Sequence, residues 1–297
     1  MFYFQVIDTI SVILLALCLI YLIQRIFYAI VGVFANKKFP KANKQLKYGI
    51  IISARNEENV IVNLLDSIKN LDYPKDKVVP FVIAHNCSDN TAKIARDNGA
   101  ICYEYFNEKE KTVGYAYKHI FECIKRDYKL SDFDGFIIIN ADNILSKNYL
   151  STMNDAFVAN NQDKIITSYR NSTNFGSNIL SCMYGLMFLC ECRFQFRGRT
   201  ALNVSSRVCG TGYMFSSKIV ENGWNYVSLT EDWEFTADQV MQGNKIIYCS
   251  EAMFFDEQPT RLSIMCKQRL RWAKGHLFVF SKYFGKLFKS LFSGVFR

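Results

Sequence analysis

Two short motifs in the C-terminal part of the chain carry residue types that do chemistry. The first, at residues 230–232, reads Thr-Glu-Asp and offers carboxylates that can act as a general base. The second, at residues 268–272, follows the pattern Gln-x-x-Arg-Trp. It offers an amide, a guanidinium suited to a diphosphate, and an aromatic face. A base beside a site for an anionic leaving group suits the transfer of a group from an anionic donor to a hydroxyl.

Apolar runs and helical patterns alternate upstream of these motifs. The runs predict buried strands at residues 48–54, 78–84, 101–105 and 136–139. Helices are predicted between them, at residues 91–98 and 113–128. This alternation predicts an α/β fold with a mainly parallel sheet. Ligands of such sheets bind beyond the carboxyl ends of the strands.

Polar clusters follow three of the predicted strands, at Ser53 to Glu57, His85 to Asp89 and Asn140 to Asn143. We expect the three clusters to converge on one rim of the sheet. Each has a structural alternative: a helix cap at Asp89, acids in the first turn of a helix opening at residues 55–59, or a turn after Asn140. Because all three lie at the same edge, a shared ligand site is favoured.

Composition restricts the class of protein. The chain has 297 residues, half of them hydrophobic, with a net charge of +9. It is long enough for a large core and too apolar for disorder. The positive charge indicates an anionic partner such as a membrane surface or a phosphorylated substrate. Ten cysteines without paired CxxC spacing predict reduced thiols rather than a zinc ribbon or a disulfide framework.

The N-terminus carries an apolar stretch long enough to span a membrane. It is interrupted by Arg25 and followed by lysines at positions 37, 38, 41, 44 and 47. By the positive-inside rule, the N-terminus lies outside and the main domain is cytoplasmic, at the cell membrane. A buried helix of a soluble protein is the alternative. The predicted organisation is an anchor at residues 1–35, a basic linker at 36–47, a main domain at 48–260 and a C-terminal helical segment at 261–297.

Two further apolar segments are expected to lie against the sheet or the membrane. Residues 178–199 are too short for a comfortable span and predict an amphipathic helix. After Trp272, phenylalanines interleaved with lysines predict an interfacial amphipathic helix, with a core-packing helix as the alternative. Because the sequence shows one clear span, we expect a longer protein or a further membrane subunit.

Taken in order, the motifs resemble the family 2 glycosyltransferases, in particular the membrane-bound, inverting branch. That branch contains the synthases of cellulose, hyaluronan, chitin and poly-N-acetylglucosamine. The resemblance extends over about residues 48–290, and the pairing of the two C-terminal motifs is its most specific part. It implies a GT-A type, Rossmann-like domain. Such a domain moves a sugar from a nucleotide-diphospho-sugar to a hydroxyl of a growing polysaccharide or glycolipid.

The resemblance also implies roles for individual residues. Asp232 is the expected general base, with Glu231 beside it, and Asp142 is the expected ligand of Mg²⁺ or Mn²⁺. The expected donor-binding residues are Ser53, Ala54, Arg55, Asn56, Glu57, His85, Asn86, Lys111, Asn140, Ala141 and Asp142. Those expected to bind the diphosphate or the acceptor are Gly210, Thr211, Gly212, Gln268, Arg271 and Trp272.

Two positions depart from the family pattern. His85 stands where the family has an aspartate that contacts uracil, and Asn140 replaces the first aspartate of the DxD motif. A UDP-sugar is still the expected donor, because a histidine ring can hydrogen-bond a base edge. The departures leave open a catalytically impaired accessory or donor-binding subunit. Nucleic acid is not expected as a partner, since the lysines cluster near the predicted membrane segments rather than along a groove.

Overall fold

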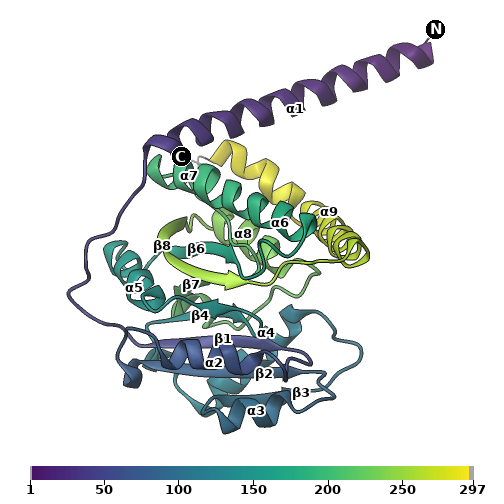
Figure 1. The fold of residues 1–297 in the computed structure, drawn as a ribbon. Coiled ribbons are helices and arrows are strands. Elements are labelled where there is room, and N and C mark those ends of the chain that lie inside the picture. The colour runs from purple at the N-terminus through teal and green to yellow at the C-terminus, as the bar shows by residue number, and fades with distance from the viewer. Residues whose placement is uncertain (1, 294–297) are drawn as a thin grey trace.

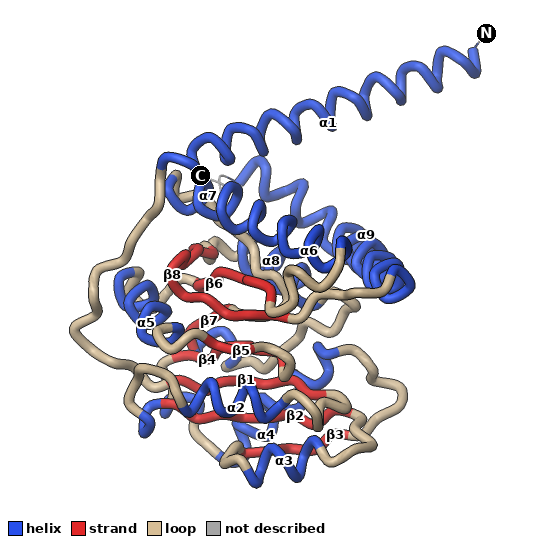
Figure 2. Tube along the Cα trace, in the orientation of Figure 1, coloured by secondary structure: helices blue, strands red, loops and turns tan. Residues whose placement is uncertain are grey.

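One sheet runs through the computed structural model, which describes residues 2–293 (Figures 1 and 2). Residues 294–297 of the predicted C-terminal segment lie outside this description. The strand order is β3-β2-β1-β4-β7-β6-β8-β5. The strands are β1 (Tyr48–Ala54), β2 (Val78–His85), β3 (Ile101–Tyr105), β4 (Gly135–Asn140), β5 (Ile144–Leu145), β6 (Ile165–Ser172), β7 (Tyr213–Ser216) and β8 (Ile246–Asp256).

The part of the sheet formed by β1 to β4 is parallel. β1 lies between β2 and β4, and β2 also pairs with β3. The central strand is buried on both faces, as Ile50, Ile51 and Ile52 show, which explains its continuous apolar sequence. Ser53 pairs in register with Asn140 of β4, so the polar ends of these strands share one edge. The predicted α/β fold is confirmed.

The other part of the sheet is mixed. β7 is antiparallel to both β4 and β6, β5 is antiparallel to β8, and β6 and β8 are parallel to each other. The sheet as a whole is therefore mixed but mostly parallel. Of these elements, β5 and β6 were not predicted from the sequence, and neither was the helix between them.

Helices cover both faces of the sheet (Figure 1). One core joins the sheet to α2, α3 and α5, and a second core joins its other face to α4 and α8. The helices of the domain are α2 (Ile61–Lys69), α3 (Thr91–Asp97), α4 (Val113–Asp127), α5 (Tyr149–Ala159), α6 (Ile179–Cys190), α7 (Arg197–Ala201), α8 (Glu231–Met241) and α9 (Leu262–Ser293). Short 3₁₀ turns lie at Lys75–Lys77, Leu130–Asp132 and Ser217–Val220.

The N-terminal helix α1 (Phe2–Phe34) projects away from the domain, and only its C-terminal part docks on it (Figure 1). Tyr3, Leu14 and Ile23 are more than half exposed although apolar, whereas Tyr28 is buried. The docked part packs on α7 and on a π-helix at Glu191–Phe196 that joins α6 to α7. An exposed apolar helix of this length is suited to a membrane anchor.

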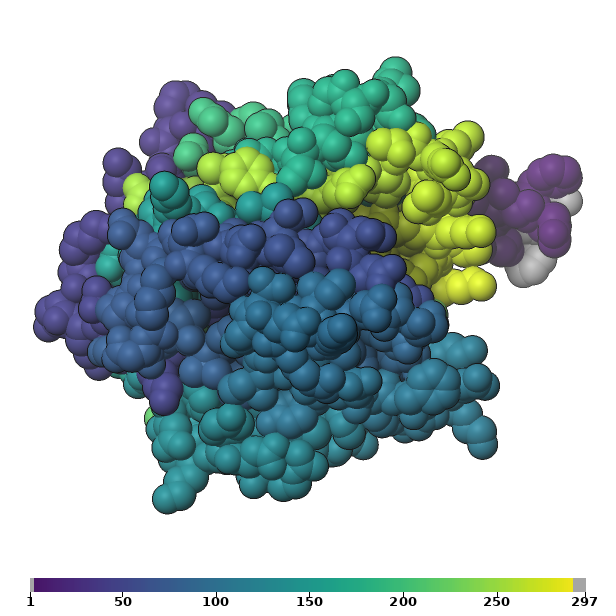
Figure 3. Space-filling model, turned by 60° about the horizontal axis from the view of Figure 1, so that its bottom comes forward, coloured from purple at the N-terminus to yellow at the C-terminus, as the bar shows by residue number. Residues whose placement is uncertain are grey.

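Two other helices differ from their predicted extents. The sequence predicted that the apolar segment at residues 178–199 is too short to span a membrane. In the structure α6, the π-helix and α7 form one helical stretch, Ile179–Ala201, which is long and apolar enough to cross a membrane, although it is partly buried. α9 is continuous from Leu262 to Ser293, so the segment with the Gln-x-x-Arg-Trp motif and the amphipathic segment form one helix. Figure 3 shows the surface of α9, in yellow, beside that of α6, in green.

Candidate active site

The predicted site residues surround one cavity of about 640 Å³. One wall is the polar edge of β1, β2 and β4; the opposite wall consists of the N-terminus of α8 and the first half of α9. Predicted residues that line the cavity are Ser53, Ala54, Arg55, Glu57, His85, Lys111, Asn140, Ala141, Asp142, Gly210, Glu231, Asp232, Gln268, Arg271 and Trp272. The two groups, distant in the sequence, therefore face the same space.

Four predicted residues do not line this cavity: Asn56, Asn86, Thr211 and Gly212. Asn56 and Asn86 adopt left-handed backbone angles, with φ of 59° and 53°. Their side chains hold neighbouring loops: Asn56 Oδ1 accepts from the backbone N–H of Ser88 at 2.8 Å, and Asn86 makes two bonds to the backbone of Asn107. Both residues shape the rim rather than face the cavity.

The turn after β1 also differs from the prediction. The helix was expected to open at residues 55–59, but α2 begins at Ile61, because Asn56 turns the chain out of helical geometry. Glu57 consequently precedes the helix and lines the cavity. Its backbone N–H donates to the hydroxyl of Thr91 at 2.8 Å, which fixes the loop against α3.

A hydrogen-bond chain holds the ends of β1 and β4 together. The Ser53 hydroxyl donates to Asn140 Oδ1 at 3.3 Å. The backbone N–H of Asn140 donates to the Thr211 hydroxyl at 3.0 Å, and that hydroxyl donates to Asn143 Oδ1 at 2.7 Å. Behind Thr211, a Cβ on Gly212 would overlap the ring of Phe254, and its φ of +71° also favours glycine. Thr211 and Gly212 thus position Asn140 from behind.

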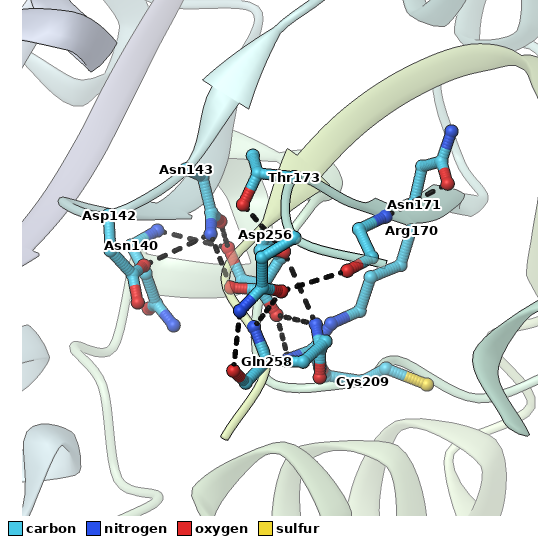
Figure 4. A network of polar contacts seen from close by, with 12 residues as sticks. Asn140, Asp142, Asn143, Arg170, Asn171, Thr173, Cys209, Asp256 and Gln258 are labelled. Atoms are coloured by element: carbon cyan, nitrogen blue, oxygen red, sulfur yellow. Dashed lines mark hydrogen bonds and ion pairs between the residues drawn. The ribbon is translucent and has the colours of Figure 1, made fainter. Parts of the chain in front are cut away.

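The carboxylate of Asp142 belongs to a buried polar network (Figure 4). Asn143 Nδ2 donates to Asp142 Oδ1 and to Asp256 Oδ1, both at 3.0 Å. Asp256 forms an ion pair with Arg170, which also lines the cavity and stacks over the ring of Phe188 at 3.9 Å. Burial raises the pKa of the Asp142 carboxyl, and the negative charges of Asp256 and Glu57 raise it further. A positive charge in the cavity would therefore be stabilised at this point.

Asp142 fits the kind of divalent cation that the sequence predicts. Within residues 2–293, no three histidine, cysteine or acidic side chains form a metal-binding cluster. Mg²⁺ commonly binds through one or two carboxylates together with substrate phosphates rather than in a complete protein cage. One carboxylate at the cavity wall, with a raised pKa and with neighbours that orient it, is consistent with that type of site.

The opposite wall places the two C-terminal motifs together. Arg271 donates to the backbone carbonyl of Leu229 at 2.9 Å, and Gly275 of α9 packs directly on the side chain of Thr230. Gln268 Oε1 and the Thr230 hydroxyl are buried and lack a hydrogen-bond partner among the described residues. Because buried polar atoms rarely stay unsatisfied, these two atoms indicate that a polar ligand belongs here.

The two acids of the first motif begin helix α8. Burial raises the pKa of both carboxyls, and Asp232 raises that of Glu231 further by its negative charge. The positive charges of Arg207, Arg271 and His276 oppose the rise at Asp232. Glu231 is nearly inaccessible, whereas Asp232 is half-buried at the cavity. Of the two, Asp232 is better placed to reach a substrate.

Several cavity residues were not assigned a role from the sequence, because they belong to no motif or, for Arg269, stand at an x position of the Gln-x-x-Arg-Trp motif. They are Arg170, Phe188, Arg207, Arg269 and His276, among others. The guanidinium of Arg269 lies over both Tyr184 and Trp272, at 4.8 and 5.1 Å from the ring centres. Cationic side chains are therefore more numerous around the cavity than the motifs indicate, which suits an anionic ligand.

Comparison with known proteins places this arrangement in a family. The model of the family described as "Glycosyltransferase like family 2" matches residues 45–275. The chain belongs to this family. The likeness includes a probable glycosyltransferase, YdaM, of Bacillus subtilis (26% identity, 82% of this chain, 58% of the relative). It also includes the poly-beta-1,6-N-acetyl-D-glucosamine synthase of Staphylococcus aureus (26% identity, 81% of this chain, 57% of the relative). The chain thus spans little more than half the length of these relatives.

Solved structures support the GT-A fold. The mannosyltransferase PcManGT of Pyrobaculum calidifontis, in complex with GDP-Man and Mn²⁺, matches with a TM-score of 0.67 and 16% identity. The match covers 91% of this chain and 74% of that one. S. aureus TarS residues 1–349 in complex with UDP-GlcNAc match with a TM-score of 0.51 and 15% identity, over 73% of this chain and 60% of that one.

Proposed function

We propose that this chain is a membrane-bound, inverting glycosyltransferase that moves a sugar from a nucleotide-diphospho-sugar to a hydroxyl of a polysaccharide or glycolipid. The observation that carries the proposal is that one cavity is lined both by Asp232, Gln268 and Arg271 and by Asp142 and His85. An inverting reaction needs a base and a counter-charge but no nucleophilic residue. The cavity provides both of these and has room for a substrate of this size.

In this mechanism Asp232 accepts the proton of the acceptor hydroxyl. Arg271 offsets the negative charge of the departing diphosphate, and Trp272 provides a flat apolar face for a sugar ring. Asp142 would hold a Mg²⁺ or Mn²⁺ ion, which supplies charge neutralisation at the diphosphate when bound. The partner-free oxygens of Gln268 and Thr230 would bind the sugar or the diphosphate.

A UDP-sugar is the proposed donor, and the complex of TarS with UDP-GlcNAc supports this choice. The complex of PcManGT with GDP-Man and Mn²⁺ makes a GDP-sugar the alternative. In this chain the uracil or guanine ring of the donor would lie near His85. The ring of His85 stacks on that of Tyr105, with ring centres 5.5 Å apart. Burial lowers the pKa of His85, which favours the neutral form of its ring.

The proposed location is the cell membrane, with the catalytic domain on the cytoplasmic side. The exposed apolar part of α1 and the lysines that follow it support this orientation. Exposed apolar side chains of α6 and α9 would rest on the lipid surface, including Ile179, Leu277, Phe280 and Phe284. A further membrane subunit is a proposed partner of this chain.

The test is turnover of a panel of nucleotide-sugars by the purified full chain in lipid nanodiscs with Mn²⁺. Release of a nucleoside diphosphate by the wild type supports an enzyme, and its absence for every donor favours the accessory-subunit alternative. Asp232→Asn should reduce turnover by about 10²- to 10⁴-fold, because the base is lost. Binding of the donor should change little. Turnover at the wild-type rate in Asp232→Asn would refute the assignment of the base.

A further inference from the structure

Arg207 is a cationic side chain close to Asp232, the proposed general base. It lies in the segment before β7, is half-buried and lines the cavity. Its guanidinium lies 5.1 Å from the ring centre of Trp233, the residue after Asp232. Its positive charge stabilises the carboxylate form of Asp232. No other part of the proposed mechanism uses Arg207.

Glu191 connects Arg207 with the N-terminal helix. Its two carboxylate oxygens bind different arginines: Oε1 lies 3.3 Å from Arg207 Nη2, and Oε2 lies 3.0 Å from Arg25 Nη2. The three side chains are only 16–34% exposed, so the pairs are screened less than surface ion pairs. The carboxylate of Glu191 therefore forms ion pairs with both Arg25 of α1 and Arg207 at the cavity.

The docking of α1 fixes this arrangement. Glu191 begins the π-helix, and in the same π-helix Gln195 Nε2 donates to the backbone carbonyl of Arg25 at 3.0 Å. α1 is thus held through both the side chain and the backbone of Arg25. π-Helical turns are rare and are found frequently at functional sites. Here the turn directs Glu191 towards both arginines.

We propose that Arg207 is a positioning residue for Asp232, and that Glu191 couples it to Arg25 of the docked anchor helix. The proposal rests on the function proposed above, in which Asp232 is the base. The positive charge of Arg207 lowers the pKa of Asp232, whereas the ion pair with Glu191 offsets part of that charge. Arg25 in turn takes part of the charge of Glu191.

The charged and titratable groups around Asp232 come from several elements. They are Glu231 and Glu234 of α8, Arg271 and His276 of α9, Arg207 and Cys209 before β7, Tyr213 of β7 and Tyr117 of α4. Burial raises the pKa of Asp232 and the positive groups lower it. Because the ionised carboxylate is the active form, turnover falls as the pH falls through this pKa. Loss of Arg207 must therefore move the acidic limb of the pH–turnover profile, where turnover falls, to higher pH.

The first experiment measures hydrolysis of UDP-GlcNAc and of GDP-Man by the full chain in nanodiscs with Mn²⁺, from pH 5 to pH 9. Arg207→Met should move the acidic limb up by about one pH unit, and Arg207→Lys should restore most of the shift. Glu191→Gln should move the limb down, by less. Arg25→Met should move it up, also by less. Glu191→Gln should lose most of its effect when Arg207→Met is already present.

The second experiment needs no donor. The difference in melting temperature between the protein and its Asp232→Asn variant is measured against pH, with and without Arg207→Met. A carboxyl with a raised pKa stabilises the fold while protonated and loses that contribution as the pH rises through its folded-state pKa. The Asp232→Asn variant therefore gains relative stability with rising pH, up to a plateau. In Arg207→Met, this plateau should begin about one pH unit higher.

The two experiments separate the proposals. If neither donor is hydrolysed but the plateau shifts, the coupling of Arg207 to Asp232 stands while the proposed donors fail. An acidic limb and a plateau that both stay in place in Arg207→Met overturn the coupling, even if the enzyme is active. The control variant is Arg193→Met, because Arg193 is an exposed arginine of the same π-helix. If the acidic limb lies at the same pH in Arg25→Met as in this control, the link to α1 is overturned.

Discussion

Asn143 is the residue whose removal tests the donor half most directly. Its side chain is completely buried and makes three hydrogen bonds: two donated to the carboxylates of Asp142 and Asp256, and one accepted from Thr211. Hydrogen bonds to charged groups contribute about 1.5–3 kcal/mol each, and the neutral one about 1 kcal/mol. The sum is about 4–7 kcal/mol. Because water can enter and replace part of it, we expect Asn143→Ala to lower the free energy of unfolding by about 4 kcal/mol.

The loss should be visible in two measurements. A decrease of this size lowers the melting temperature by about 8–16 °C in a domain of 150–250 residues, and somewhat less in a larger one. The variant should also need more Mn²⁺ for half-maximal donor turnover, by about 10- to 100-fold. This is the usual cost of removing a group that orients a metal ligand. Both effects have one cause, because the amide holds Asp142 beside Asp256 against their mutual repulsion.

Asn148→Ala is the matched control. Asn148 Oδ1 accepts one exposed bond from Ser146, at 3.0 Å, so its removal should change stability by less than about 0.5 kcal/mol. If Asn143→Ala melts like this control and keeps the wild-type response to Mn²⁺, Asn143 does not position Asp142.

Two glycine substitutions test how helices are held at the site. In Gly275→Ala the new Cβ would overlap Thr230, so α9 must move and turnover should fall by about tenfold or more. The control is Gly285→Ala, where the added carbon meets no neighbour and turnover should stay unchanged. In Gly198→Ala the Cβ would overlap the backbone carbonyl of Tyr28, so α1 should undock. Limited proteolysis should then cut the linker at residues 36–47 faster than in the wild type, and an unchanged rate would contradict this docking.

The strands that carry the donor half could be predicted because their signals are local. Each is a short apolar run that ends in a polar cluster, and parallel pairing places those ends together without further information. The turn at Asn56 could not be placed in this way. Acids near the expected helix start suggested a first turn, but the left-handed backbone of Asn56, stabilised by a bond from Ser88, moves that start to Ile61.

The residues that the sequence did not reveal act through contacts distant in the chain. Arg170 acquires its place from Asp256, 86 positions away, and Glu191 joins Arg25 to Arg207. α5 and β6 were missed for a related reason. α5 is buried along most of its length, including polar residues such as Asn154, so its sequence lacks a clear polar face.

The neutral Asn140 has a physical explanation in the same network. Asp142 already has two acidic neighbours, Asp256 and Glu57, which raise its pKa, and the positive charge of Arg170 opposes their effect. An aspartate at position 140, the last residue of β4 and two residues before Asp142, would add a third negative charge. That charge would favour the protonated, non-coordinating form of Asp142. Asp256, which belongs to no donor motif, thus supplies the second carboxylate near Asp142. The altered motif is therefore compatible with a cation-binding donor half.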